Sequence, residues 1–440
     1  MRNSLIYFFA VLALFSSCKK DDKSVFNQSA DDRLNATLAK YQTQLSGAQY
    51  GWKGLVFPAG GGAFSFYFKF NDSNRVKMLS DFDSTTAVTL KESSYRLKAL
   101  QQPSLIFDTY SYIHLPADPN ENVGVISNVN GGPVGVGLQS DFEFYFDSTT
   151  VDTIKLVGRF NGSKAILIRA TSQEATAYNS GQLAAGLLIK KILTYFKRVT
   201  IGTQRLDVKV SAADRTIIFS YLDAGGNLHT FTTGFYFTAG GIAFINPLVI
   251  GNVIISSFNN MQFNATTEVI SLTVNNVAST LTGVVVPVKV DIAAPKRWWD
   301  YAVTNNNDYW ISYNGFHVNG VDDAYGINSL RSGDNTYFYL IYWPAYTTAN
   351  DFFGPIFLNA ARTSLTLVYG TAPQKPTFTA DGRAVFIELG NYGTHPATGA
   401  AALTRTKLYN SSGYYFVQTS ATSYDMVSAL DGKSWITWDF

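Results

Sequence analysis

Apolar and polar side chains alternate in short stretches along most of the chain, and many of the apolar positions hold phenylalanine or tyrosine. In residues 64–70, phenylalanine occupies every second position, and the polar residues 71–74 follow as a turn. Because successive side chains of a strand point to opposite faces, this period of two places the rings on one face. The same pattern predicts further strands at residues 75–79, 94–97, 105–114, 141–146, 154–160 and 165–169.

Two segments have the spacing of an amphipathic helix. In residues 29–47, Leu34 and Leu38 begin an apolar stripe, and Ser29 is suited to cap the N-terminus. Residues 174–198 carry a second apolar stripe and end in basic residues, which suit the negative C-terminal end of a helix. The sequence therefore predicts one helix before the first strands and a longer helix in the middle of the chain.

Part of the pattern recurs after the second predicted helix. Residues 74–83 and 214–223 match at their arginine, serine and final aspartate, and residues 146–150 resemble residues 263–267. We interpret this as a duplicated unit, a helix followed by an antiparallel meander. Hairpin turns also favour the same residue types without common descent, so convergence stays open as the alternative.

A third section begins near Pro295. Residues 296–301 are expected to form a short helix, and aromatic strands are expected at residues 337–343, 364–369, 384–389, 414–418 and 435–438. The predicted fold class is α+β, predominantly β, with duplicated helix-plus-meander units and a C-terminal β-rich section. The expected divisions are a signal peptide at 1–17, a tether at 18–28, units at 29–172 and 173–294, and the C-terminal section at 295–440.

The N-terminal residues have the pattern of a bacterial lipoprotein precursor. Arg2 precedes an uncharged apolar run at residues 5–15, and two serines stand before Cys18. This run is too short to span a bilayer, which needs about 20 apolar residues. We expect Cys18 to be acylated and to anchor the chain in the outer membrane, with cleavage of an ordinary signal peptide nearby as the alternative. Because Cys18 is the sole cysteine, the folded part then has no thiol for disulfides or catalysis.

The charged run after the cysteine suggests where the anchored protein is displayed. Lys20, Asp21 and Asp22 resemble the export signal that directs lipoproteins of the Bacteroidetes to the extracellular face of the outer membrane. The alternative interpretation is a solvated tether, and the two interpretations are compatible.

Composition excludes some classes of function. The 440 residues are 46% hydrophobic and 15% charged, so the chain can bury a large core. Its formal charge of +2 comes from 34 basic and 32 acidic residues spread along the chain. Nucleic-acid binding normally needs a concentrated basic surface, so no nucleic-acid partner is expected.

The sequence contains no motif for a known chemistry. The four histidines are far apart and lack the paired spacing of a zinc site, and the glycine run at 60–62 lacks the residues of a phosphate-binding loop. We predict no catalytic residues, no metal site and no cofactor. Neighbouring carboxylates such as Asp141 with Glu143, or Asp322 with Asp323, are expected to cap turns, with glycoside hydrolysis or cation binding as alternatives.

Four tryptophans of the C-terminal section are the candidate ligand-binding residues. Indole rings stack on sugars when they are coplanar and face solvent, whereas packing in an aromatic β core is the competing interpretation. The candidates are Trp298, Trp299, Trp310 and Trp343.

Several strings of the N-terminal part resemble a family of Bacteroidetes lipoproteins, domain of unknown function 4302 (DUF4302). The strings are YGWKG (50–54), FYFKF (66–70), SYRL (94–97), LIFDTY (105–110) and SDFEF (140–144). The resemblance supplies no catalytic residues. It implies a non-catalytic accessory that binds a glycan, a peptide or a partner for a TonB-dependent uptake system of the SusC and SusD type. A surface hydrolase of the same locus and a structural or adhesion protein stay open as alternatives.

Overall fold

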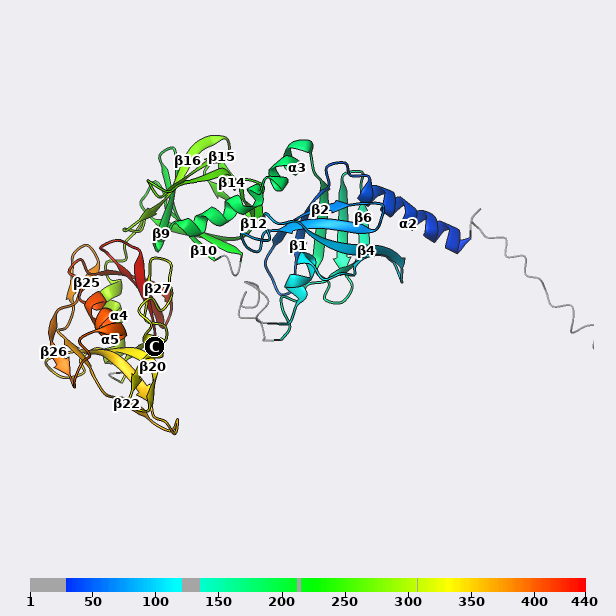
Figure 1. The fold of residues 1–440 in the computed structure, drawn as a ribbon. Helices are drawn as coiled ribbons and strands as arrows, with labels where there is room; N and C mark the ends of the chain where they lie inside the picture. Colours follow the sequence, from blue (N-terminus) through cyan, green and yellow to red (C-terminus); the bar gives the residue numbers. More distant parts are fainter. Residues whose placement is uncertain (1–28, 121–134, 212–214, 307) are drawn as a thin grey trace, which may run out of the picture.

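The computed structural model describes residues 29–120, 135–211, 215–306 and 308–440. These residues form two closed β-barrels, here barrel 1 and barrel 2, followed by a C-terminal sheet domain. Barrel 2 lies in the middle, and the C-terminal domain is at the opposite end of the molecule from helix α2 (Ala30–Ser46) (Figure 1). The predicted predominance of antiparallel β-structure is confirmed.

The predicted lipidation and export residues lie outside the described part of the chain. Cys18, Lys20, Asp21 and Asp22 all precede residue 29, so their roles stay predictions. No helix within the described ranges combines the length and apolar character needed to cross a bilayer.

Barrel 1 closes where β1 pairs with β8, which follows it by more than a hundred residues. Its strands are β1 (Trp52–Phe57), β2 (Phe64–Phe70), β3 (Arg75–Ser80), β4 (Lys91–Ala99), β5 (Pro103–Phe107), β6 (Glu143–Thr149), β7 (Thr153–Gly158) and β8 (Lys164–Arg169), with the 3₁₀ helix η1 (Tyr112–Ala117) after β5. Helix α2 begins after Ser29, whose side chain accepts from Asp32 N–H as the sequence predicted. It packs on the barrel through Leu45, whose carbonyl accepts from the Trp52 indole at 2.9 Å.

Barrel 2 repeats the same order of eight antiparallel strands. They are β9 (Phe196–Ile201), β10 (Gln204–Ser211), β11 (Thr216–Leu222), β12 (Leu228–Thr238), β13 (Gly241–Ile250), β14 (Val253–Asn264), β15 (Val269–Val274) and β16 (Val277–Val284). The matched sequences fall at equivalent places, on the third strands β3 and β11 and at the ends of the sixth strands β6 and β14. Asp83 and Asp223, which follow the two third strands, each accept backbone N–H groups of the next turn. The equivalent positions support the predicted duplication.

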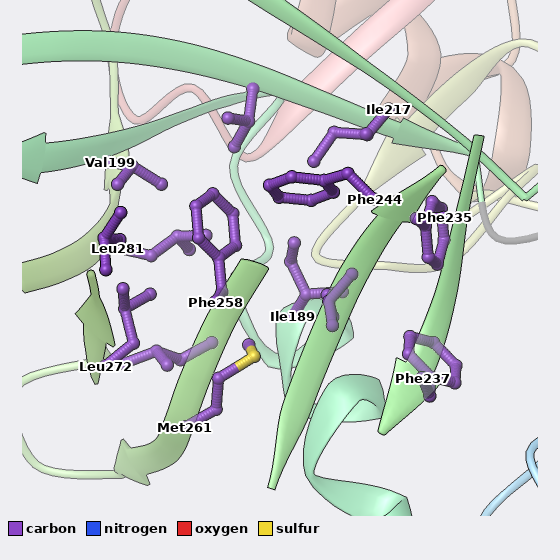
Figure 2. Packing of buried hydrophobic residues seen from close by; sticks show 14 of the residues in the cluster. Ile189, Val199, Ile217, Phe235, Phe237, Phe244, Phe258, Met261, Leu272 and Leu281 are labelled. Atoms are coloured by element: carbon purple, nitrogen blue, oxygen red, sulfur yellow. The ribbon is translucent and has the colours of Figure 1, made fainter. Parts of the chain in front are cut away.

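The single long helix predicted at residues 174–198 is wrong. The structure has a short helix α3 (Ser172–Asn179), a 3₁₀ helix η4 (Gln182–Lys191) and then strand β9. Gly181 separates the helices with a φ of 80°, a left-handed conformation that few other residues adopt easily. The apolar side chains of this segment instead fill barrel 2, where Ile189 of η4 lies among the core residues of the strands (Figure 2).

The C-terminal domain is built on one 13-stranded sheet. Its strands are β17 (Trp310–Ser312), β18 (Phe316–Val318), β19 (Arg331–Ser332), β20 (Asn335–Trp343), β21 (Phe352–Leu358), β22 (Leu365–Leu367), β23 (Gly370–Pro373), β24 (Thr377–Phe378), β25 (Arg383–Val385), β26 (Glu388–Tyr392), β27 (Tyr414–Ser420), β28 (Ser423–Ser428) and β29 (Ser434–Asp439). The expected short helix is α4 (Ala294–Thr304), and η5 (Ile327–Ser329) and α5 (Gly399–Leu408) are additional helices that the sequence pattern did not predict.

A buried ion pair joins the two barrels. Asp81 follows β3 of barrel 1 and Arg215 precedes β11 of barrel 2, and their side chains are 0% and 3% exposed. Both Nη atoms of Arg215 lie 3.2 Å from the Asp81 carboxylate, which also accepts from the Phe237 N–H at 3.3 Å. Ser65 of β2 donates to the carbonyl of Phe237, so the outer face of β2 lies against β12. The barrels therefore share a continuous, desolvated contact.

Tyr195, which immediately precedes β9 of barrel 2, contacts the C-terminal domain. Its hydroxyl donates to Asp425 Oδ2 at 2.6 Å, and its backbone N–H donates to the Gly432 carbonyl at 2.7 Å. Lys433 adds an ion pair with Glu268 at 2.7 Å. Polar contacts of this kind hold the domain beside the barrel and leave grooves along the junction.

Candidate functional site

Three of the four tryptophans predicted as a ligand platform are buried, and the prediction is wrong for them. Trp298 and Trp310 are 0% exposed and Trp299 is 8% exposed. Two of their indole N–H groups donate inside the fold. Trp299 donates to Asp351 at 2.8 Å, and Trp310 donates to the Trp298 carbonyl at 3.1 Å. Helix α4 turns its aromatic side onto the sheet, because large rings bury the most apolar area there.

The fourth tryptophan, Trp343, is half-buried and lies on the opposite side of the sheet. It belongs to an aromatic face formed by side chains of β20, β26 and the neighbouring loops, namely Tyr309, Tyr339, Trp343, Tyr346 and Tyr392. The Trp343 ring lies 5.1 Å from Tyr309 and 5.2 Å from Tyr346. The hydroxyls of Tyr309 and Tyr339 are 3.1 Å apart, so this face combines rings with polar groups.

A small polar pocket adjoins the aromatic face, and we call it the Trp435 pocket. Its volume is about 240 Å³. It is lined by Ser312, Tyr313, Asn314, Gly315, His317, Asp322, Asp323, Trp435, Thr437 and Asp439. Residues 435, 437 and 439 alternate along the outer side of β29, while residues 313–315 connect β17 and β18, which both pair with β29.

Hydrogen bonds and stacking order one wall of the Trp435 pocket. The His317 ring stacks on Trp435 with 3.7 Å between centroids, and its Nδ1 lies 2.5 Å from the Asp322 carboxylate. Asp323 accepts from backbone N–H groups of η5, at 2.7 Å from Ile327. These contacts assign Asp323 to turn capping, as the sequence predicted for neighbouring carboxylates. Among the described residues, no group of three or more potential ligands is arranged to hold a metal ion.

Tyr313 connects the pocket with the aromatic face. Its side chain is 57% exposed, and its ring lies 6.4 Å from that of Tyr339 in an edge-on arrangement. Its backbone carbonyl accepts from the Tyr337 hydroxyl at 3.1 Å, which fixes the loop while the Tyr313 ring faces solvent. The arrangement therefore offers an exposed ring for stacking beside hydroxyl, amide, imidazole and carboxylate groups for hydrogen bonding.

Among the described residues, the two carboxylates whose pKa is raised lie in different parts of the fold. Burial raises the pKa of Asp81, opposed by Arg215, and burial also raises the pKa of Asp351, opposed by hydrogen bonds from Tyr342 and Trp299. Asp81 joins the barrels and Asp351 ties α4 to the sheet, and neither lines the Trp435 pocket. Asp141, another carboxylate considered from the sequence, accepts from Phe160 N–H and caps a loop.

Sequence reasoning missed the residues that the fold brings together at this pocket. Trp435 stood out only as part of a predicted strand, and His317 only as an isolated histidine. The one useful signal in the sequence is the pair of neighbouring carboxylates Asp322 and Asp323, for which cation binding is one of the alternatives. Register between β18 and β29, which pairs His317 with Trp435, is what assembles the site.

Comparison with protein families gives a match over residues 22–265 to the family described as Domain of unknown function (DUF4302). The chain belongs to this family. The match extends through β14 and so includes barrel 1 and most of barrel 2, whereas the C-terminal domain with the Trp435 pocket lies beyond it. Comparison with curated proteins gives no significant match.

The chain shows weak likenesses to solved structures. Isotype 1 transferrin binding protein B (TbpB) from serogroup B Neisseria meningitidis is 11% identical, with 89% of this chain and 74% of that chain covered and a TM-score of 0.15. The DNA polymerase III subunit beta from Pseudomonas aeruginosa is 9% identical, with 92% of this chain and 97% of that chain covered and a TM-score of 0.14. Scores this low carry no argument about fold or function.

Proposed function

We propose that this DUF4302 protein is a lipid-anchored, non-catalytic binding protein on the extracellular face of the outer membrane. Its role is to capture a glycan and present it to a TonB-dependent uptake system of the SusC and SusD type. The observation that carries the proposal is the junction of the Trp435 pocket with the aromatic face through the exposed Tyr313.

A glycan suits this junction for two physical reasons. Sugar rings have apolar C–H faces that pack on exposed aromatic rings, and Tyr313 offers such a ring. Sugar hydroxyls need several converging donors and acceptors, which Asn314, His317 and Asp439 supply in the adjoining pocket. A pocket of about 240 Å³ favours one or two sugar units at a time, with the aromatic face extending the contact.

The arrangement of the molecule supports a display role. Helix α2 and the C-terminal domain lie at opposite ends (Figure 1). An anchor at Cys18 therefore leaves barrel 2 and the C-terminal domain as the parts that extend away from the membrane.

A glycan-binding assay tests the proposal. Affinity electrophoresis of the full-length protein through gels that contain different polysaccharides is expected to show retardation by at least one class. The double variant Tyr313→Ala/His317→Ala is expected to weaken retardation at least tenfold. Phe160→Ala, which removes a 74% exposed ring from barrel 1, serves as the matched control and is expected to bind normally. If no polysaccharide class retards the wild-type protein, or if the double variant is retarded as strongly as the wild type, glycan binding at this site is refuted.

Two further measurements separate the components of the proposal. Glycan recovered after incubation is expected to keep its chain length, whereas shortened products would favour the surface hydrolase. Protease added to intact cells is expected to degrade the protein, and Cys18→Ala is expected to release it from membranes. Crosslinking in intact cells is expected to capture an outer-membrane transporter.

A further inference from the structure

A second concave site lies at the junction of barrel 2 with the C-terminal domain, and we call it the lysine groove. Its volume is about 290 Å³. Its apolar walls include Leu228 of β12, Val288 and Val290 of the connection between the two domains, and Val417 of β27. Leu228 is 48% exposed, so part of the wall faces solvent. Three lysines line the same groove: Lys197, Lys209 and Lys289.

The two carboxylates of the groove are already neutralised. Asp207 pairs with Arg198 at 2.6 Å, and Asp291 pairs with Arg297 at 2.7 Å. The Asp207–Arg198 pair also holds the connection between the domains, because Arg198 donates to the Val286 carbonyl at 3.0 Å. These ion pairs shape the groove and use both carboxylates of its lining, so neither is left to pair with Lys197 or Lys289.

The three ammonium groups make only partial contacts with protein oxygens. Lys197 donates to the Thr194 carbonyl at 2.6 Å, and Lys289 donates to the Gly226 carbonyl at 3.3 Å. Lys209 forms a loose ion pair with Asp425 at 3.9 Å, and the same carboxylate also accepts from the hydroxyls of Tyr195 and Thr437 at 2.6 Å each. The groove and its ion-pair partners together hold three lysines and two arginines against three carboxylates, which leaves two positive charges in excess beside the apolar walls.

Burial adds to the cost of this excess charge. Desolvation lowers the pKa of Lys197 to about 8. An anion in the groove would offset that desolvation, whereas a neutral ligand would bury the ammonium groups further. Apolar walls and this excess of positive charge together favour a ligand that has both an apolar body and a negative charge.

We propose that the lysine groove binds a small amphipathic anion, namely an aliphatic chain that ends in one carboxylate. The carboxylate lies against Lys209 and Lys289, and the chain packs on Leu228, Val290 and Val417. The volume of about 290 Å³ is at the lower end for small-ligand sites, so it limits the chain to medium length. This site is separate from the Trp435 pocket and does not depend on the glycan proposal.

Isothermal titration calorimetry tests this proposal with decanoate as the probe. The full chain is used as the Cys18→Ala variant, because removal of the predicted acylation site avoids detergent that would sequester decanoate. Saturable binding of decanoate is expected, with at least tenfold weaker binding of decanol, which has the chain without the charge. Acetate, which has the charge without the chain, is expected to give no measurable binding.

Variants assign the binding to the groove. Lys209→Gln/Lys289→Gln is expected to weaken decanoate binding at least tenfold, and Leu228→Ser is expected to weaken it severalfold. The control Lys155→Gln/Lys164→Gln removes two exposed lysines from barrel 1 and is expected to bind as before. Absence of decanoate binding, equal binding of decanol, or an unchanged affinity of the lysine groove variant overturns the proposal. Retardation by polysaccharide is expected to stay unchanged in the same variant, which keeps failure here distinct from failure of the glycan proposal.

Discussion

Replacing Asp81 with alanine is expected to loosen the contact between the two barrels. The substitution removes the only carboxylate that pairs with Arg215 among the described residues, and the guanidinium is 3% exposed. Arg215 lies 4.6 Å from the Phe237 ring and 4.8 Å from the Phe64 ring, so water does not replace the lost partner easily. The Phe237 N–H loses an acceptor in the same variant.

The magnitude follows from these contacts. Removal of one partner from a buried ion pair costs about 3–5 kcal/mol, because the remaining charge is buried without compensation. We therefore expect Asp81→Ala to lower the free energy of opening at the interface by about 4 kcal/mol. The double variant Asp81→Ala/Arg215→Met removes both charges and keeps an apolar side chain between the phenylalanines. Its loss is expected to be about 1–2 kcal/mol, mostly from the small cavity and the unpaired N–H.

Hydrogen–deuterium exchange measured by mass spectrometry is the suitable assay, because it resolves opening in separate parts of the chain. Peptides from β2, β3 and β12 are expected to exchange faster in Asp81→Ala and to regain most of their protection in the double variant. Peptides from β20 and β21 of the C-terminal domain serve as the internal control. A change below about 1 kcal/mol in Asp81→Ala, or a double variant as weak as the single one, contradicts the reasoning about a buried uncompensated charge.

Three further substitutions give separate predictions. Lys197→Met is expected to stabilise the protein at pH 7 by about 2 kcal/mol, because burial lowers the pKa of Lys197 to about 8 against about 10.4 in the unfolded chain. Between pH 8 and pH 10 the folded state loses this proton before the unfolded state does, so the free energy of unfolding of the wild type rises over this window. The stability advantage of Lys197→Met, measured by urea unfolding, is therefore expected to shrink from pH 8 to pH 10. Asp351→Ala is expected to cost about 4 kcal/mol, because the Trp299 indole, the Tyr342 hydroxyl and the Ala345 N–H lose one shared buried acceptor. Tryptophan fluorescence during urea unfolding measures this loss, and a cost below 1 kcal/mol would count against the network. Gly186→Ala is expected to lower the melting temperature, because the added Cβ would stand 2.1 Å from the Phe237 ring. Calorimetry measures this temperature, and an unchanged value would contradict the tight packing of η4 on β12.

Local structure in this protein follows closely from residue patterns. The alternating phenylalanines at residues 64–70 form β2 with the predicted bounds, and the serine-capped helix begins after Ser29. The matched segments of the two halves occupy equivalent strands of two barrels. Periodicity and capping depend on neighbours within a few positions, so the sequence alone contains the information needed for them.

The candidate site was less accessible to the same reasoning. Aromatic residues were expected to matter in the C-terminal section, but Trp298 and Trp310 pack in its core. The exposed ring is Tyr313, and its partners His317 and Trp435 are more than a hundred residues apart in the chain. A sequence pattern states that a ring is present but does not state which face of the sheet it occupies or what covers that face.

The sequence by itself determined the strand-rich character, the internal repeat and most element positions, because these depend on short-range periodicity and turn chemistry. Tertiary structure decided the rest. Closure of β1 onto β8 and burial of Asp81 against Arg215 depend on contacts between distant segments. The same holds for the pockets, which form where strand register and domain junctions bring separate side chains together. These contacts join residues that are far apart in the sequence, so no short segment of the sequence predicts them.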